Sequence, residues 1–259
     1  MKNTHHDIPP ALAQALRQAR RVVVFTGAGV SAESGIATFR DALTGLWSRF
    51  DAQALATPEA FAADPDIVWG WYEWRRAQVL RAAPNAAHRA IADLARHVPE
   101  LAVITQNVDD LHERAGSPRI LHLLGRFDQP RCSACAMPYT LAAPPAKPGR
   151  QGPFPPPPAC RICGNLVRPG RLWHGEPPAS DVWAIAKGLA ASADLILAVG
   201  TSCETPAAAE FCYAAMADGA ELVQINPNPT LLDRVAAHNI KGPAEKILPL
   251  LLARAWPGA

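Results

Sequence analysis

The sequence has no apolar run that approaches the roughly 18 residues needed to cross a bilayer, so no membrane-spanning helix is expected. Its first ten residues are polar and lack the apolar stretch of a secretion signal, which predicts a cytoplasmic protein. Net charge is also small, because 25 Lys and Arg against 23 Asp and Glu leave +2 over 259 residues. This balance argues against nucleic-acid binding and against attachment to a membrane surface.

Proline, in contrast, is abundant. The chain has 26 prolines in 259 residues, which is about 10% and roughly twice the usual share. Twelve of them lie between Pro138 and Pro178, where long helices are therefore not expected. Because 49% of all residues are hydrophobic, the chain can still bury a sizeable core, and disorder of the whole chain is excluded. The length allows one large domain or two small ones.

Short apolar runs rich in β-branched residues recur along the chain and have the length of buried strands. Helix-like stretches lie between several of them, at residues 11–20, 88–97 and 207–217. This alternation predicts an α/β fold in which helices cover a parallel sheet. The expected strands are residues 21–25, 101–105, 120–123, 195–199 and 222–225.

Two segments interrupt the alternation and are expected to be insertions. One is rich in Trp, Ala and Arg and is expected to be helical, and the other carries the prolines and two Cys-x-x-Cys pairs. The predicted domains are a sheet domain of residues 1–40, 86–125 and 171–259, a helical insertion of 41–85 and a metal-binding module of 126–170.

The residues that follow the expected strands are small or carry amide groups. Ligands in open α/β sheets bind beyond the carboxyl ends of the strands, so these residues predict a ligand site. Each of them taken alone is equally typical of an ordinary turn. They are Thr26 to Gly29, Gln106 and Asn107, Gly125, Gly200 to Ser202, and Asn226.

The segment from Gly27 to Ala32 fits the pattern G-x-G-x-x-A. Glycines in this pattern allow a tight turn and let backbone N–H groups approach a pyrophosphate. The acidic ribose ligand that usually ends the next strand is missing, because residues 38–41 lead into the helical insertion. The motif by itself is a weak signal, and it predicts nucleotide binding in an unusual variant of the fold.

Four cysteines form two Cys-x-x-Cys pairs, Cys132 with Cys135 and Cys160 with Cys163, separated by 24 residues. Four thiolates suit one tetrahedral Zn²⁺ at about 2.3 Å each and leave no position open for water, so a structural zinc is predicted. A redox-active pair is the alternative, but it would need a helix start, and the prolines oppose one. For Cys203 and Cys212 we expect the role of small buried hydrophobic residues.

Two long motifs and three short ones occur along the chain: GAGVSAESGIATFR from Gly27 to Arg40, TQNVDDLHERAG from Thr105 to Gly116, the two cysteine pairs, Gly200 to Ser202, and Gln224 to Asn226. Together they resemble the sirtuin (Sir2-type) family of NAD-dependent protein-lysine deacylases, over about residues 15–250. The resemblance implies a Rossmann-like large domain, a small zinc domain, and a cleft between them for NAD and an acyl-lysine peptide.

The same resemblance implies which residues hold NAD. Amides and hydroxyls suit ribose and carboxamide groups, the Asp109 carboxylate can accept from the carboxamide, and Arg40 can meet phosphate. The implied cofactor residues are Gly27, Ala28, Gly29, Glu33, Thr38, Phe39 and Arg40 in a flexible loop, Gln106, Asn107 and Asp109 around nicotinamide, and Gly200, Thr201, Ser202, Asn226 and Ala244 around adenosine. Positioning by Gln106 and Asn107 would assist the departure of nicotinamide.

Tyr72 and Arg75 fall where the resemblance to the desuccinylase branch places two residues that read an acidic acyl chain. An Arg in an acyl pocket would pair with a succinyl or malonyl carboxylate, and a phenol would donate a second hydrogen bond. The alternative is that Tyr72 belongs to the packing of a Trp-rich helix and that Arg75 lies on its solvated face.

The sequence departs from the family at the general base. Sirtuins carry a His directly before the glycine at this place, and counting back from Gly125 puts Leu124 there. Leucine cannot accept a proton, and loss of a general base costs on the order of 10²–10⁴-fold in rate. His122 is a candidate substitute, although two residues along a strand is about 6.5 Å, and a packing role is the alternative. His174 stands where the family usually has an aromatic residue.

The predicted function is NAD-dependent deacylation of acylated-lysine proteins by a monomer, with a desuccinylase or demalonylase preference and with nicotinamide and O-acyl-ADP-ribose as products. Because Leu124 replaces the base, two alternatives stay open. One is an impaired homologue that binds NAD or acyl-lysine without turnover. The other is an ADP-ribosyltransferase or NAD hydrolase, which needs nicotinamide cleavage alone.

Overall fold

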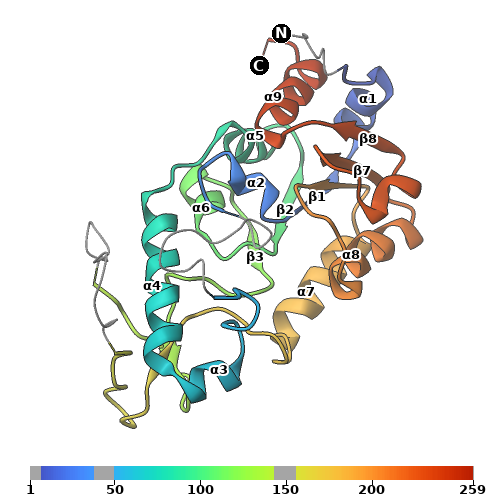
Figure 1. Ribbon diagram of the computed structural model, residues 1–259. Coiled ribbons are helices and arrows are strands. Elements are labelled where there is room, and N and C mark those ends of the chain that lie inside the picture. Colours follow the sequence, from blue (N-terminus) through green and yellow to red (C-terminus); the bar gives the residue numbers. More distant parts are fainter. Residues whose placement is uncertain (1–6, 38–49, 143–155, 259) are drawn as a thin grey trace.

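A computed structural model of the protein describes residues 7–37, 50–142 and 156–258 (Figure 1). Its centre is a six-stranded sheet of strand order β3-β2-β1-β6-β7-β8, and every pair of neighbouring strands is parallel. This order is that of the Rossmann fold, so the α/β prediction is confirmed. The strands are β1 (Arg21–Thr26), β2 (Glu100–Thr105), β3 (Ile120–His122), β6 (Leu195–Val199), β7 (Glu221–Asn226) and β8 (His238–Lys241).

All five expected strands form. Four of them, β1, β2, β6 and β7, are apolar runs buried on both faces of the sheet, whereas β3 is half-buried. In β1, Val22 and Val24 enter one core cluster, whereas Val23 and Phe25 enter another. Strand β8 was not predicted. It lies at the edge of the sheet and buries only Ile240, so it lacks the apolar run by which the other strands were recognised.

Helices cover both faces of the sheet (Figure 1). The helices α1, α5 and α9 pack on the face of Val22 and Val24, and α7 and α8 pack on the face of Val23 and Phe25. In the described ranges, no helix combines the length and the apolar character that crossing a membrane requires. The bounds are α1 (Pro10–Gln18), α5 (Ala86–Leu94), α9 (Ala244–Ala255), α7 (Ser180–Ala191) and α8 (Pro206–Ala217).

A second layer of structure lies beside the sheet and contains α3 (Pro58–Ala63) and α4 (Pro65–Arg81). Side chains cap both helices, since Thr57 accepts from the backbone N–H of Ala60 and Asp64 from that of Ile67. The expected helical character of this segment is thus found where it is described. The short elements are α2 (Gly29–Ala32), α6 (Leu111–Ala115), the 3-10 helix η2 (Leu231–Arg234), and the antiparallel pair β4 (Arg131–Cys132) and β5 (Val167–Arg168).

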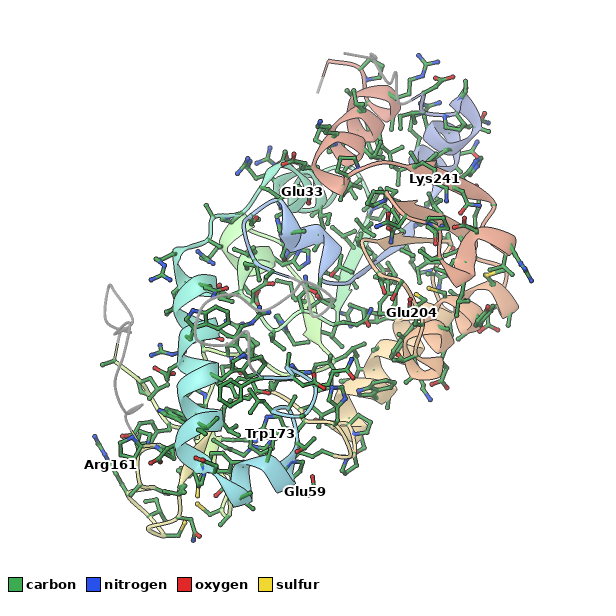
Figure 2. The ribbon with its side chains drawn as sticks, in the orientation of Figure 1. Glu33, Glu59, Arg161, Trp173, Glu204 and Lys241 are labelled. Carbon is green, nitrogen blue, oxygen red and sulfur yellow. The ribbon has the colours of Figure 1, made fainter. Side chains whose placement is uncertain are left out.

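Phe127, before β4, and Trp173, after β5, contact α3 and α4 through an aromatic cluster. Trp173 lies near α3 and α4 (Figure 2), with its ring centroid 5.2 Å from that of Phe61. Tyr72 of α4 meets the ring of Phe127 edge-on at 5.6 Å. These contacts join the helical segment and the cysteine module into one apolar unit beside the sheet. The exact domain boundaries stay a prediction.

Candidate active site

The carboxyl ends of β1 and β6 meet at the centre of the sheet, where the strand order reverses. The two loops that leave these strands cross closely, because the N–H of Gly27 donates to Val199 O at 3.1 Å and that of Gly29 to Gly200 O at 2.9 Å. Gly200 has φ +59°, and a Cβ there would lie 2.5 Å from the backbone nitrogen of Val30. Only glycine fits at that crossing.

A pocket of about 540 Å³ opens at these strand ends, which is the size of a small-molecule site. It extends from the glycine loops across the sheet edge to α4 and to the segment that carries Trp173. Glu33, which follows α2 and is labelled in Figure 2, is one of its lining residues. The predicted residues that line it are Gly27, Ala28, Gly29, Glu33, Arg75, Gln106, Asn107, Asp109, Leu124, Gly200, Thr201, Ser202 and Asn226.

Other predicted residues do not line this pocket. Ala244 begins α9 and is buried in the core behind the sheet. Tyr72 and His122 are also absent from the lining. Thr38, Phe39 and Arg40 lie outside the described residues.

The centre of the pocket is a buried polar network that joins α2 to the loop after β2. The Ser31 hydroxyl donates to Asp109 Oδ2 at 3.0 Å and accepts from Asn107 Nδ2 at 3.1 Å. The three side chains are 1%, 4% and 6% exposed, respectively, and burial raises the pKa of Asp109. The N–H of Leu111 donates to the other carboxylate oxygen of Asp109 at 3.1 Å. Ser31 was not among the predicted site residues, although it lies inside the G-x-G-x-x-A motif.

Two fully buried histidines stand behind this network. His88 Nε2 lies 3.4 Å from the Ser31 hydroxyl, and His112 Nε2 lies 3.1 Å from the hydroxyl of Thr26. Their rings pack with centroids 4.9 Å apart. Burial lowers the pKa of His88 to about 4 and that of His112 to about 3, so both are neutral at pH 7. They hold the network in place, and no sequence signal marked them.

The other half of the pocket is fixed around Thr201. Gln106 Nε2 donates to its hydroxyl at 2.8 Å, and Asn226 Nδ2 donates to its carbonyl at 3.0 Å. The loops after β2, β6 and β7 are therefore tied together at the level where the strands end. Amide and hydroxyl groups at this place suit the hydroxyls and ring nitrogens of a nucleoside.

Leu124 lines the pocket, whereas His122 is directed elsewhere. His122 Nδ1 donates to Asn107 O at 2.9 Å, and its Nε2 lies 2.8 Å from a carboxylate oxygen of Glu113. Strand β3 ends at His122 and a turn follows, so the alternation of a strand does not carry from residue 122 to residue 124. The contacts favour a role for His122 in holding the Asn107 loop over a role as substitute base.

Of the two residues expected to read an acyl chain, the structure brings one into the pocket. Arg75 lines it from α4, is only 5% exposed, and donates from Nη2 to Ala37 O at 2.9 Å. The Tyr72 hydroxyl accepts from Trp173 Nε1 at 2.9 Å inside the aromatic cluster. Tyr72 therefore supports the wall behind the pocket.

The four cysteines of the two pairs converge, and all four sulfur atoms lie within 4.8 Å of one another. The Sγ atoms of Cys132 and Cys163 are 3.4 Å apart, and those of Cys135 and Cys160 are 3.7 Å apart. Four sulfurs at 2.3 Å from a tetrahedral zinc would be separated by about 3.8 Å. The cluster therefore fits a structural zinc.

Comparisons with known proteins agree with this geometry. A sequence model described as the Sir2 family matches residues 27–206. A relative from Methylococcus capsulatus, named NAD-dependent protein deacylase, is 54% identical over 93% of this chain and 94% of its own. NAD-dependent protein deacylase 1 of Pseudomonas aeruginosa is 51% identical over 96% of this chain and 99% of its own.

Solved structures are similar over the same length. A Sir2 homologue in complex with NAD has a TM-score of 0.88 and 39% identity, with 98% of both chains covered. A Sir2 complex with a p53 peptide and NAD⁺ has a TM-score of 0.80 and 27% identity, with 97% of this chain and 98% of that chain covered. These similarities span the sheet, the pocket and the cysteine module.

Proposed function

Because this chain belongs to the Sir2 family, we propose that it removes acyl groups from lysine side chains of proteins, with NAD as the co-substrate and with nicotinamide and O-acyl-ADP-ribose as products. The observation that carries this proposal is the pocket at the strand ends with its Ser31, Asn107 and Asp109 network. The names of the relatives from M. capsulatus and P. aeruginosa support it.

The groups that line the pocket fit NAD. Gly27, Ala28 and Gly29 line the pocket without bulky side chains, so a pyrophosphate can approach the backbone closely. Thr201 and Asn226 would meet the adenosine half, and Asp109 would accept from the carboxamide. When bound, NAD supplies a ribose carbon that becomes electrophilic as nicotinamide leaves.

The chain's own residues orient these groups. Asn107 is fixed twice, since its backbone N–H donates to the Thr105 hydroxyl at 3.0 Å and its side chain to Ser31. A side chain that is already fixed loses little entropy and needs no reorganisation as charge develops nearby. Val108 and Val79 add apolar surface to the lining, which excludes water from the reacting atoms.

The proposed reaction is tested by incubating the protein with NAD and a succinyl-lysine peptide while free lysine and nicotinamide are followed separately. Release of both supports the deacylase. An acetyl-lysine peptide in parallel gives the acyl preference. Binding of NAD without release of either product would contradict the proposal and support a binding homologue.

A second candidate function is NAD hydrolysis or ADP-ribosyl transfer. It is favoured by Leu124, which lines the pocket at the position of the family's general base and carries no proton acceptor. In the experiment above, release of nicotinamide without free lysine would support this candidate.

For the acyl group, we propose a preference for succinyl or malonyl chains, based on the buried Arg75 in the pocket wall. We expect Arg75→Met to lower kcat/KM for a succinyl-lysine peptide by about 10- to 100-fold, because one charge-assisted hydrogen bond is worth about 1.5–3 kcal/mol. The kcat/KM for an acetyl-lysine peptide should change by less than about threefold on the same reasoning. Arg81→Met at the exposed end of α4 is the control. Equal loss with both peptides would contradict a carboxylate-reading role.

We further propose that the protein acts as a cytoplasmic monomer on acylated proteins and contacts neither nucleic acid nor a membrane. The support is the net charge of +2, which gives no extended field of one sign. Light scattering after size-exclusion chromatography would test the monomer, and a mass of two or more chains would contradict it.

A further inference from the structure

The pocket that lacks a base at position 124 contains a histidine elsewhere in its lining. His174 lines the same pocket as Leu124, and within the described part of the chain no second histidine does so. The residue before it, Trp173, is buried in the aromatic cluster, whereas His174 is exposed. The imidazole of His174 is therefore open to a bound ligand.

The backbone places His174 close to Leu124. The N–H of Leu172 donates to Leu124 O at 2.8 Å, that of Arg126 donates to Gly170 O at 3.0 Å, and Gly125 pairs with Arg171 in an antiparallel bridge. His174 follows two residues after Leu172, about 6.5 Å along an extended chain. Its own N–H donates to Ala56 O at 2.9 Å, so its position is fixed.

The other histidines of the described chain are already engaged. His88 and His112 are fully buried behind Ser31 and Thr26. His122 contacts Asn107 O and Glu113. His97 stacks on Trp256, and His238 lies 3.0 Å from Glu221. None of these five can turn an imidazole into the pocket without breaking its contacts.

We propose that His174 is the general base of this pocket and supplies, from the segment beside Leu124, the imidazole that position 124 lacks. The inference rests on the proposed deacylase function. In the step concerned, an imidazole nitrogen accepts the proton of a ribose hydroxyl while the hydroxyl oxygen bonds to the acyl carbon. The imidazolium then returns this proton to the lysine nitrogen as the carbon–nitrogen bond breaks. Solvent water then adds, which leaves a hydroxyl at the ribose carbon that nicotinamide left and releases the water's other proton to solvent, so His174 ends as it began.

The charges around His174 keep it available as a base. Partial burial, and then the Arg171 guanidinium, lower the pKa of His174 below its usual 6.5. The other charged groups of the pocket lining are Arg75 from α4, Glu33 beyond α2 and Asp109 beyond β2. A histidine of lowered pKa is neutral at pH 7, and it loses basic function only as the pH falls through that lowered value. Lysine release should therefore show an acid limb below pH 6.5 that depends on residue 174.

The first test is His174→Asn, which keeps a polar side chain but removes the titrating nitrogen. We expect lysine release in a single turnover to slow by about 100-fold or more, while nicotinamide release changes by less than about threefold. The acid limb of the pH profile should disappear with the substitution. His97→Asn, outside the pocket, is the matched control. If His174→Asn still releases lysine at the wild-type rate, the role of His174 as general base is overturned but the deacylase function is not. If the wild-type protein releases no lysine, the deacylase function is overturned as well.

The second test does not depend on turnover. Diethylpyrocarbonate carbethoxylates open imidazoles, and mass spectrometry locates the modified residue. We expect bound ADP-ribose to slow modification of His174 at least fivefold and to leave His97 unchanged. Modification of His174 at the same rate with and without ADP-ribose would place it away from the ribose and overturn the proposal.

A double variant tests whether a histidine at position 124 can replace His174 as the general base. We expect Leu124→His in the His174→Asn background to restore lysine release to within about tenfold of the wild-type rate, because general-base catalysis needs one imidazole within reach of the ribose. Folding of both variants is checked by their thermal unfolding. A double variant that binds ADP-ribose normally but stays as slow as His174→Asn would contradict this exchange of roles.

Discussion

Cys163→Ser is expected to lower bound zinc from one ion per chain to almost none and to unfold the module around the cysteine cluster. A serine hydroxyl is a poor zinc ligand at neutral pH, and the remaining three sulfurs leave one position open. Structural zinc sites contribute on the order of 10–16 kcal/mol of binding free energy. Metal analysis gives the stoichiometry, and limited proteolysis reports whether residues 131–168 stay folded.

Ser133→Ala is the matched control, because Ser133 lies between two zinc-binding cysteines and has an exposed side chain. Its backbone N–H, which donates to Leu166 O at 2.9 Å, is kept in the variant. The variant should retain one zinc and resist protease like the wild type. Full metal content in Cys163→Ser, or no metal in the wild type, would contradict a four-cysteine zinc site.

Loss of zinc should also alter the structure of the pocket wall, because residues next to the cysteine module contact the segment that lines the pocket. The Arg168 guanidinium lies 3.6 Å over the Trp173 ring, and its Nη2 donates to Glu176 Oε2 at 2.8 Å. Glu176 in turn accepts from the Trp173 N–H at 2.7 Å. Arg168 ends β5, beside the cysteines, and Trp173 directly precedes His174. We therefore expect loss of zinc to disturb the segment that carries His174.

The sheet could be predicted from sequence because its strands are buried on both faces and are therefore continuous apolar runs. The same reasoning fails at an edge, and β8 with its single buried Ile240 was not found. It also fails at a strand end, since the expected strand over residues 120–123 stops at His122. Pairing at the edge and the onset of a turn depend on neighbouring elements rather than on a local pattern.

The rim of the pocket was also predictable, because residues that follow parallel strands must gather at one edge of the sheet. The supporting contacts were not. Ser31 and Asp109 are 78 positions apart in the chain, and Thr26 and His112 are 86 apart. No local sequence motif predicts contacts between residues so far apart in the chain, and whether these positions are buried depends on the whole fold.

Gly200→Ala is expected to lower the free energy of unfolding by about 3 kcal/mol. Part of this, about 1–2 kcal/mol, comes from a side chain in the left-handed region, where Gly200 has φ +59°. The rest, about 1–3 kcal/mol, is overpacking, because the added Cβ would lie 2.5 Å from the nitrogen of Val30. Urea unfolding measures the change. Calorimetry with ADP-ribose should show affinity reduced at least tenfold, since Gly200 also lines the pocket.

Gly188→Ala is the control that distinguishes the effect of the close loop crossing from the effect of replacing any glycine by alanine. Gly188 lies within α7, and nothing stands within 4 Å of a Cβ added there. The helical propensity of alanine should therefore stabilise this variant by about 0.5–1 kcal/mol, with ADP-ribose affinity unchanged. An unchanged free energy of unfolding and an unchanged ADP-ribose affinity in Gly200→Ala would contradict this prediction. They would mean that the loops after β1 and β6 can move apart at no cost and that their close crossing does not form the NAD site.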